Sequence, residues 1–203
     1  MILRMISGRL RPDGLARLHD ASEPLARPRR YEATAVGEPT RSILAVDPAG
    51  RDLLAVTVWS DVAGARDALD AELAGLTRAA VPPEIATFGN PTHFDIESSW
   101  LERGPEDPAY LRVAIGRFTK PGAHFEMEEL LRQRMPQLDE DMVVACVGRR
   151  MVDRSVDVLF LSGWRRRPVD LELGEAIWSD ISLRYDQFSV RVYLAPRLVA
   201  VQA

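Results

Sequence analysis

The sequence has little of what secreted, redox-active or membrane-spanning proteins need. It holds one cysteine, Cys146, so no disulfide can close within the chain. That cysteine lies in the apolar run 142–147, which predicts a buried strand and a packing role. No stretch of about 18 apolar residues could span a bilayer, and Arg4 interrupts the apolar start too early for a signal peptide. We therefore expect a cytoplasmic protein with no membrane partner.

Positive charge and phosphate-binding motifs are also scarce. The 26 Lys and Arg residues stand against 30 Asp and Glu, a net charge of −4, whereas a nucleic-acid binder needs a clustered basic face. Two short arginine clusters, at 27–30 and 165–167, fit solvated turns. A Gly-x-Ser-x-Gly elbow, a phosphate-cradling loop and a dinucleotide fingerprint are all missing. These absences argue against hydrolases, nucleotide-dependent enzymes and nucleic-acid partners.

What the sequence does have is an internal repeat. Leu, Arg, Gly and Arg recur in the same order at residues 3–9 and 111–117, an offset of 108 (111 − 3). An apolar run ends in Trp59 and another in Trp164, an offset of 105 (164 − 59). Between the copies, segment 101–109 combines charge, a glycine and two prolines, which predicts a linker. We therefore expect two domains, 1–104 and 105–203, and the 46% of hydrophobic residues suffices for two cores.

Hydrophobic periodicity predicts the same element order in both halves: strand, helix, strand, strand, helix, strand. In the first half the strands are expected at 2–10, 31–36 with a possible extension at 42–46, 53–59 and 92–100, and the helices after the Pro-Asp-Gly turn at 12–14 and at 63–79. In the second half the strands are expected at 110–118, 142–151, 156–164 and 187–194, and the helices at 123–135 and 171–181. This is the ferredoxin-like split βαβ order, which predicts an α+β protein.

The two copies also resemble a known family. A strand of the form Leu-Arg-x-x-x-Gly-Arg, then Pro-Asp-Gly or Lys-Pro-Gly and a helix, then an apolar strand ending in Trp, resembles the antibiotic-biosynthesis-monooxygenase-like branch of the dimeric α+β barrel superfamily. The resemblance covers both halves. It implies that two ferredoxin-like βαββαβ repeats pair their antiparallel sheets into one barrel, a pseudo-dimer within one chain. Such a chain would be a monomer or a homodimer of barrels.

Two residue types in the repeat could contact a ligand. Arg4 and Arg112 occupy equivalent places in apolar strand rows, and a buried arginine needs a partner. That partner is either a carboxylate of the protein or an anionic ligand held bidentately. Trp59 and Trp164 each follow a hydroxyl residue by two positions, so each half places an indole beside a hydroxyl on one strand face. These tryptophans either pack the core or form a flat wall for an aromatic substrate.

One histidine is the candidate for proton transfer. His93 has no histidine counterpart in the second half, and an imidazole can accept a phenolic proton near neutral pH. Asn90 is a candidate hydrogen-bonding neighbour; the plainer alternative is that His93 is a surface or internally satisfied residue. His124 and Glu128 have helical i, i+4 spacing, but two ligands are too few for a metal site, and the run 126–129 fits an acidic helix face.

Two functions remain open at this point. The resemblance implies a cofactor-independent, monooxygenase-like enzyme that binds a small aromatic or polyketide-like metabolite between helices and sheet, with His93 removing a proton. The alternative is a non-catalytic small-molecule-binding or structural barrel, in which duplication has kept the fold. Haem binding is a third possibility, because His19, His93 and His124 are available as axial ligands.

Overall fold

The computed structural model describes residues 1–18, 41–59, 81, 83–96, 100–102, 108–120, 122–134, 141–167 and 185–195. The chain divides into two compact units, one of Met1–His93 with Tyr193–Ala203 and one of Phe94–Val192. The division falls inside the strands β5 (Thr92–Asp95) and β10 (Gln187–Leu194), so each of these strands contributes residues to both units. The repeat boundary after Gly104 stays a prediction.

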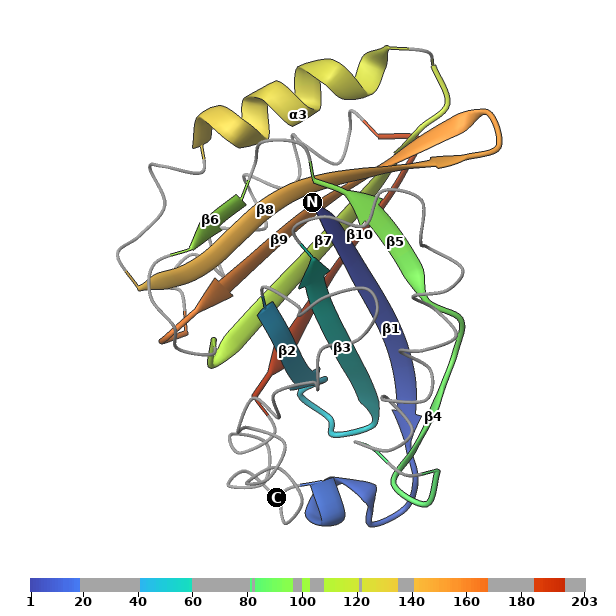
Figure 1. Ribbon diagram of the computed structural model, residues 1–203, viewed down its shortest axis with the longest axis vertical. Helices are drawn as coiled ribbons and strands as arrows, with labels where there is room; N and C mark the ends of the chain where they lie inside the picture. Colours follow the sequence, from blue (N-terminus) through green and yellow to red (C-terminus); the bar gives the residue numbers. More distant parts are fainter. Residues whose placement is uncertain are drawn as a thin grey trace. The chain divides into compact units, whose positions relative to one another are not determined.

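The first unit is built on an antiparallel sheet (Figure 1). Its strands are β1 (Ile2–Leu10), β2 (Arg41–Val46), β3 (Asp52–Trp59) and β4 (Ala86–Phe88). β3 lies between β1 and β2, and β4 pairs with the end of β1. Both faces of β1 are buried over residues 2–6, as its apolar rows on both sides predict. A helix begins at residue 14 and is described as far as residue 18.

In its described residues the second unit is also mostly antiparallel sheet, and these residues include the helix α3 (Ala123–Arg134). β9 (Ser155–Trp164) lies between β7 (Tyr110–Phe118) and β8 (Met142–Val152). β10 neighbours β7, and β6 (Trp100–Glu102) and β5 both pair with β8. The helix α3 packs on β8 and β9. None of the helices in the described part of the chain has the length and apolar character of a membrane span.

The central hairpins of the two units have the same register. In the first, Ile2 faces Trp59 and the pairing runs on to Arg9 facing Asp52. In the second, Tyr110 faces Trp164, and the pairing passes through Arg117 facing Asp157. Moving β1 by 108 residues and β3 by 105 superposes all eight pairs of the first hairpin on pairs of the second. The two offsets found in the sequence therefore describe one geometric relationship.

Glycines at equivalent places in the two hairpins admit aromatic rings. A Cβ on Gly116 would lie 1.9 Å from the ring of Tyr185, and one on Gly8 would lie 2.8 Å from the ring of Phe88. Tyr185 in turn packs against Phe118, with ring centroids 4.5 Å apart. The glycine of the repeated Gly-Arg pair thus gives each sheet space for a ring, which a side chain at that position would close.

Several expectations about the strands are confirmed, and one needs correction. The strands at 2–10, 110–118 and 187–194 are found with those bounds, and Cys146 is fully buried in β8. A single strand over 92–100 is wrong: β5 ends at Asp95, and β6 begins at Trp100. The pairs Asp95–Arg149 and Trp100–Cys146 are five residues apart on one side and three on β8, so β5 and β6 do not continue one register along β8. The short strand β4 was not predicted.

Some predicted elements lie outside the described residues. These are the strand at 31–36 and the helices at 63–79 and 171–181. The second strand of the first half is found at Arg41–Val46, where only an extension was expected. Taken together, the described elements form an α+β fold that is mostly antiparallel sheet with few helices.

Candidate functional site

Three polar residues of the second unit lie together on one face of its hairpin. Arg112 on β7 faces Ser162 on β9, and Trp164 lies two residues beyond Ser162, on the same side of the sheet. The indole N–H of Trp164 donates to Ser162 Oγ at 3.2 Å. The guanidinium carbon of Arg112 lies 5.8 Å from the centroid of the Trp164 ring, within cation–π range. We call this group, Arg112 with Ser162 and Trp164, the Arg112 face.

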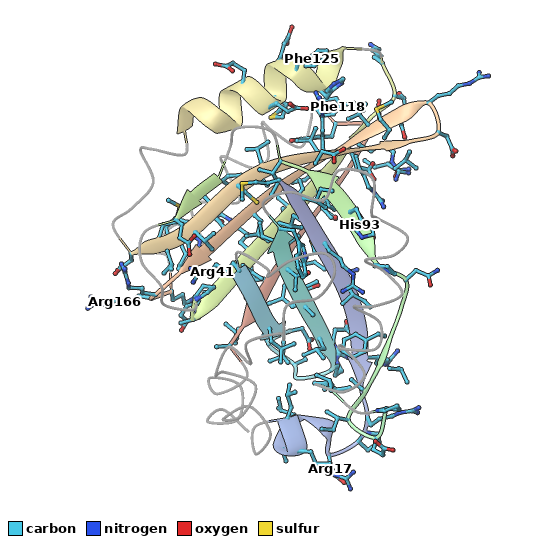
Figure 2. All side chains as sticks on the ribbon, viewed as in Figure 1. Arg17, Arg41, His93, Phe118, Phe125 and Arg166 are labelled. Carbon is cyan, nitrogen blue, oxygen red and sulfur yellow. The ribbon has the colours of Figure 1, made fainter. Side chains whose placement is uncertain are left out.

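The surroundings of the Arg112 face are apolar and include the helix. Trp164 belongs to a buried cluster that also contains Phe118 and Phe160 of the sheet and Met127 of α3. Figure 2 labels Phe118 between α3 and the sheet and Phe125 on the outer side of the helix, in agreement with their exposures of 4% and 57%. Arg112 is 7% exposed, so its charge is held among apolar side chains. A buried charge in such a place needs compensation from another group.

The first unit has an equivalent group, formed by Arg4, Thr57 and Trp59. Arg4 faces Thr57 across the β1–β3 pair, and Trp59 lies two residues beyond Thr57. Arg4 is 3% exposed and Trp59 is 1% exposed. We call this group the Arg4 face. It differs from its counterpart in its hydrogen bonds: within the described part of the chain, the buried atoms Trp59 Nε1 and Thr57 Oγ1 have no hydrogen-bond partner.

The structure brings four of the six predicted site residues into these two groups. Arg4 joins Trp59, and Arg112 joins Trp164. His93 is half-buried on β5, the strand next to β1 in the sheet, and Figure 2 marks its position there. Asn90 is exposed in the segment before β5, so it lies outside either buried group. His19 lies outside the described residues.

The expectation of an acidic, solvated face for residues 126–129 is wrong in one part. Glu126 and Glu129 are exposed, but Glu128 is only 3% exposed, and His124, one turn earlier on α3, is also buried. Met127 is buried beside them, so this side of the helix packs inward. The i, i+4 spacing was the available signal, because it places both residues on one side of a helix. Among the described residues, no group of three or more candidate metal ligands is found.

A second polar group on the sheet was not predicted. Asp157 on β9 is 1% exposed and receives hydrogen bonds from Arg117 Nε at 2.6 Å and Arg150 Nε at 2.9 Å. Burial opposes ionisation of this carboxyl, but the hydrogen bonds from the two arginines outweigh it and lower the pKa of Asp157. Asp157 alternates with Val158 and Val156 along β9, which places it on the opposite side from Ser162. This network therefore stabilises the sheet away from the Arg112 face.

The comparisons with known proteins identify related folds. No family model and no curated protein matches the chain. A candidate monooxygenase from Fusobacterium nucleatum is similar in structure, with a TM-score of 0.61 and 14% identity over 95% of this chain and 91% of that one. An anthrone oxidase-like protein follows with a TM-score of 0.55 and 15% identity, over 95% of this chain and 90% of that one. A candidate monooxygenase from Lactobacillus acidophilus has a TM-score of 0.54 and 13% identity, over 95% and 93%. At these identities the likeness establishes that the chain adopts the α+β fold of these monooxygenase-like structures.

Proposed function

We propose that the protein is a monooxygenase-like enzyme that binds a small aromatic or polyketide-like metabolite between sheet and helices and oxygenates it without a cofactor. The observation that carries this proposal is the pairing of a buried arginine with a buried tryptophan on one sheet face in each unit. An indole offers flat apolar contact and one N–H donor, and a guanidinium favours an anionic oxygen. Together they suit a planar, phenol-bearing ligand. The candidate substrate-binding residues are Arg4 and Trp59 in the first unit and Arg112 and Trp164 in the second, and the ligand binds at one of these two pairs.

The proposal includes the architecture implied by the sequence. The two halves are taken as ferredoxin-like βαββαβ repeats whose sheets form a barrel-like pseudo-dimer, with the chain acting as a monomer or as a homodimer of such barrels. The identical register of the two central hairpins supports this, because independent hairpins have no reason to share two sequence offsets. The equivalent glycines under Phe88 and Tyr185 support it as well.

In the proposed reaction, His93 acts as the base. Its imidazole removes a proton from an activated CH₂ carbon of the substrate, and the resulting carbanion is stabilised by the phenolic ring system. Dioxygen adds to this carbon, and the proton returns from the imidazolium to give a hydroperoxide. Loss of water then leaves a carbonyl group. The balance is CH₂ + O₂ → C=O + H₂O, in which the carbon is oxidised and dioxygen is the oxidant. Since Asn90 is exposed, the proton transfer rests on His93 alone.

The test is oxygen consumption with a defined probe, 1,8-dihydroxyanthrone, which oxidises to the quinone through this CH₂ step. We expect the wild-type protein to accelerate oxygen uptake above the spontaneous rate, and His93→Ala to lose about 10²-fold or more of that acceleration. Asn90→Ala is the matched control, because it changes an exposed polar residue on the same segment. Equal acceleration by wild type and His93→Ala would remove His93 from the mechanism.

A non-catalytic role is the second candidate, in which one half binds a small molecule while the pocket of the other packs shut, and one observation favours it. In the second unit the indole N–H of Trp164 already donates a hydrogen bond to the hydroxyl of Ser162. These two groups therefore do not need a ligand to satisfy them. Under this alternative the probe binds, but its oxidation is no faster than in buffer.

A further inference from the structure

We propose that the ligand occupies the Arg4 face of the first unit, where Trp59 Nε1 donates a hydrogen bond to an oxygen of a planar aromatic molecule, and that the Arg112 face of the second unit is internally closed. This inference rests on the proposed function, because it takes the same class of ligand. It specifies which of the two faces binds the ligand and which atom donates a hydrogen bond to it.

The evidence is a difference between two equivalent positions. Trp164 Nε1 in the second unit donates to Ser162 Oγ at 3.2 Å. Trp59 Nε1 in the first unit is as deeply buried, yet within the described residues neither it nor Thr57 Oγ1 has a hydrogen-bond partner. Threonine and serine both offer a hydroxyl acceptor, and the two strand pairs share one register. The residue types alone therefore do not explain why the indole N–H of Trp59 has no acceptor among the described residues.

Buried polar groups that lack a hydrogen bond indicate a site where a hydrogen-bonding partner is expected. A buried indole N–H usually finds an acceptor, and a hydroxyl can donate or accept. Here a donor and a hydroxyl lie two residues apart on one strand face, and the buried guanidinium of Arg4 lies across from the hydroxyl. An oxygen with a negative charge or a strong dipole suits all three groups. The ligand class is therefore an aromatic ring system that carries a phenolate or ring carbonyl oxygen.

The test observes the indole protons directly. The full-length protein is labelled with ¹⁵N-tryptophan, and the indole N–H signals are assigned with Trp59→Phe and Trp164→Phe. The probe is 1,8-dihydroxyanthraquinone, which carries phenolic and ring carbonyl oxygens but has no CH₂ group to oxidise. We expect the Trp59 signal to shift downfield on titration as its N–H gains an acceptor, while the Trp164 signal moves little.

Binding constants give a second, independent measurement. Trp59→Phe keeps the aromatic wall but removes the donor, so its Kd for the probe should rise about three- to tenfold, the effect of one neutral hydrogen bond. Trp164→Phe makes the same substitution at the face that we infer to be closed, so it should leave Kd within about twofold of the wild-type value. A shift confined to Trp164, with weakened binding only in Trp164→Phe, would overturn the inference, as would absence of binding.

Failure of this inference and failure of the proposed function give different results. If the Trp59 signal shifts but the protein does not accelerate oxidation of the anthrone, the binding site stands and the oxygenase function falls. If oxidation is accelerated but binding depends on Trp164, the function stands and the assignment to the first unit falls.

Discussion

Trp164 donates its indole N–H to the hydroxyl of Ser162, which lies 3.2 Å away and two residues earlier on β9. Two buried polar groups thus satisfy each other within a single strand. Their counterparts in the first unit, Trp59 and Thr57, have the same spacing and the same strand register, but their side-chain polar atoms do not pair with each other. The two hairpins therefore share one strand register but differ in the hydrogen bonding of these side chains.

Removing the Ser162 hydroxyl should destabilise the second unit. Ser162→Ala leaves the buried Trp164 N–H without an acceptor, which costs about 1–3 kcal/mol in the free energy of unfolding. Urea denaturation followed by circular dichroism measures the change. The control is Ser7→Ala on β1, an exposed serine, which should change the free energy by less than about 0.5 kcal/mol. Equal stability of Ser162→Ala and wild type would show that this hydrogen bond contributes nothing.

Thr57→Val should have the opposite sign. Valine has nearly the shape of threonine but lacks a hydroxyl, and Thr57 Oγ1 is buried without a partner among the described residues. Replacing an unsatisfied buried hydroxyl with a methyl group should leave the unliganded protein equally stable or raise its stability by up to about 1 kcal/mol. The same urea experiment checks this. A clear loss of stability would mean that the Thr57 hydroxyl has an interaction that the first unit depends on without any ligand.

The Asp157 network should make the stability of the second unit sensitive to acid. Its pKa is lowered in the folded protein from the usual 3.8, so its stabilising effect is present above that value and is lost as the pH falls through the lowered folded pKa. Asp157→Asn removes the charge between Arg117 and Arg150, and we expect a loss of about 2–3 kcal/mol near neutral pH. This is less than for a fully buried pair, because both arginines are about one-third exposed.

The control for Asp157→Asn is Asp52→Asn, the equivalent position in the first unit. Asp52 faces the exposed Arg9, so its replacement should cost less than about 1 kcal/mol. Melting temperatures are recorded for wild type and both variants from neutral pH to below about pH 4. The wild-type and Asp157→Asn curves should converge as the pH falls, whereas a constant gap between them would contradict the lowered pKa.

A side chain at Gly116 should disrupt the aromatic packing beside it. The Cβ of Gly116→Ala would lie 1.9 Å from the Tyr185 ring, so the ring must shift, and this disturbs its packing against Phe118. We expect a cost of at least about 1–3 kcal/mol and a change in the near-ultraviolet circular dichroism of the aromatic cluster. Gly89→Ala is the control, because its Cβ would meet nothing closer than the Ser7 carbonyl oxygen at 3.6 Å. Unchanged spectra for Gly116→Ala would show that the ring position is wrong.

Much of this architecture could be predicted from the sequence, because it depends on local pattern. The bounds of β1, β7 and β10 follow from apolar runs that end at turns, and the two offsets anticipated the shared register. The break between β5 and β6 could not be predicted, because it depends on how many residues of β8 lie opposite. Pattern within one strand does not reveal the length of its partner.

The candidate site was only partly predictable for the same reason. The equivalence of Arg4 with Arg112 and of Trp59 with Trp164 follows from the repeat. The burial of Glu128 depends on which side of α3 packs against the sheet. Its acidic neighbours Glu126 and Glu129 are exposed, so the run of glutamates in the sequence indicated an exposed face for all three. Trp164 donates a hydrogen bond to Ser162, whereas Trp59 does not donate one to Thr57. This difference depends on side-chain orientation, which two similar sequences do not distinguish.

The most direct test of the account is oxidation of 1,8-dihydroxyanthrone under dioxygen labelled with oxygen-18, analysed by mass spectrometry of the product. We expect a protein-dependent rate that falls in His93→Ala, and a quinone that carries one labelled oxygen at the former CH₂ carbon. A product formed no faster than in buffer, or a protein-dependent product whose new oxygen comes from water, would contradict the oxygenase function.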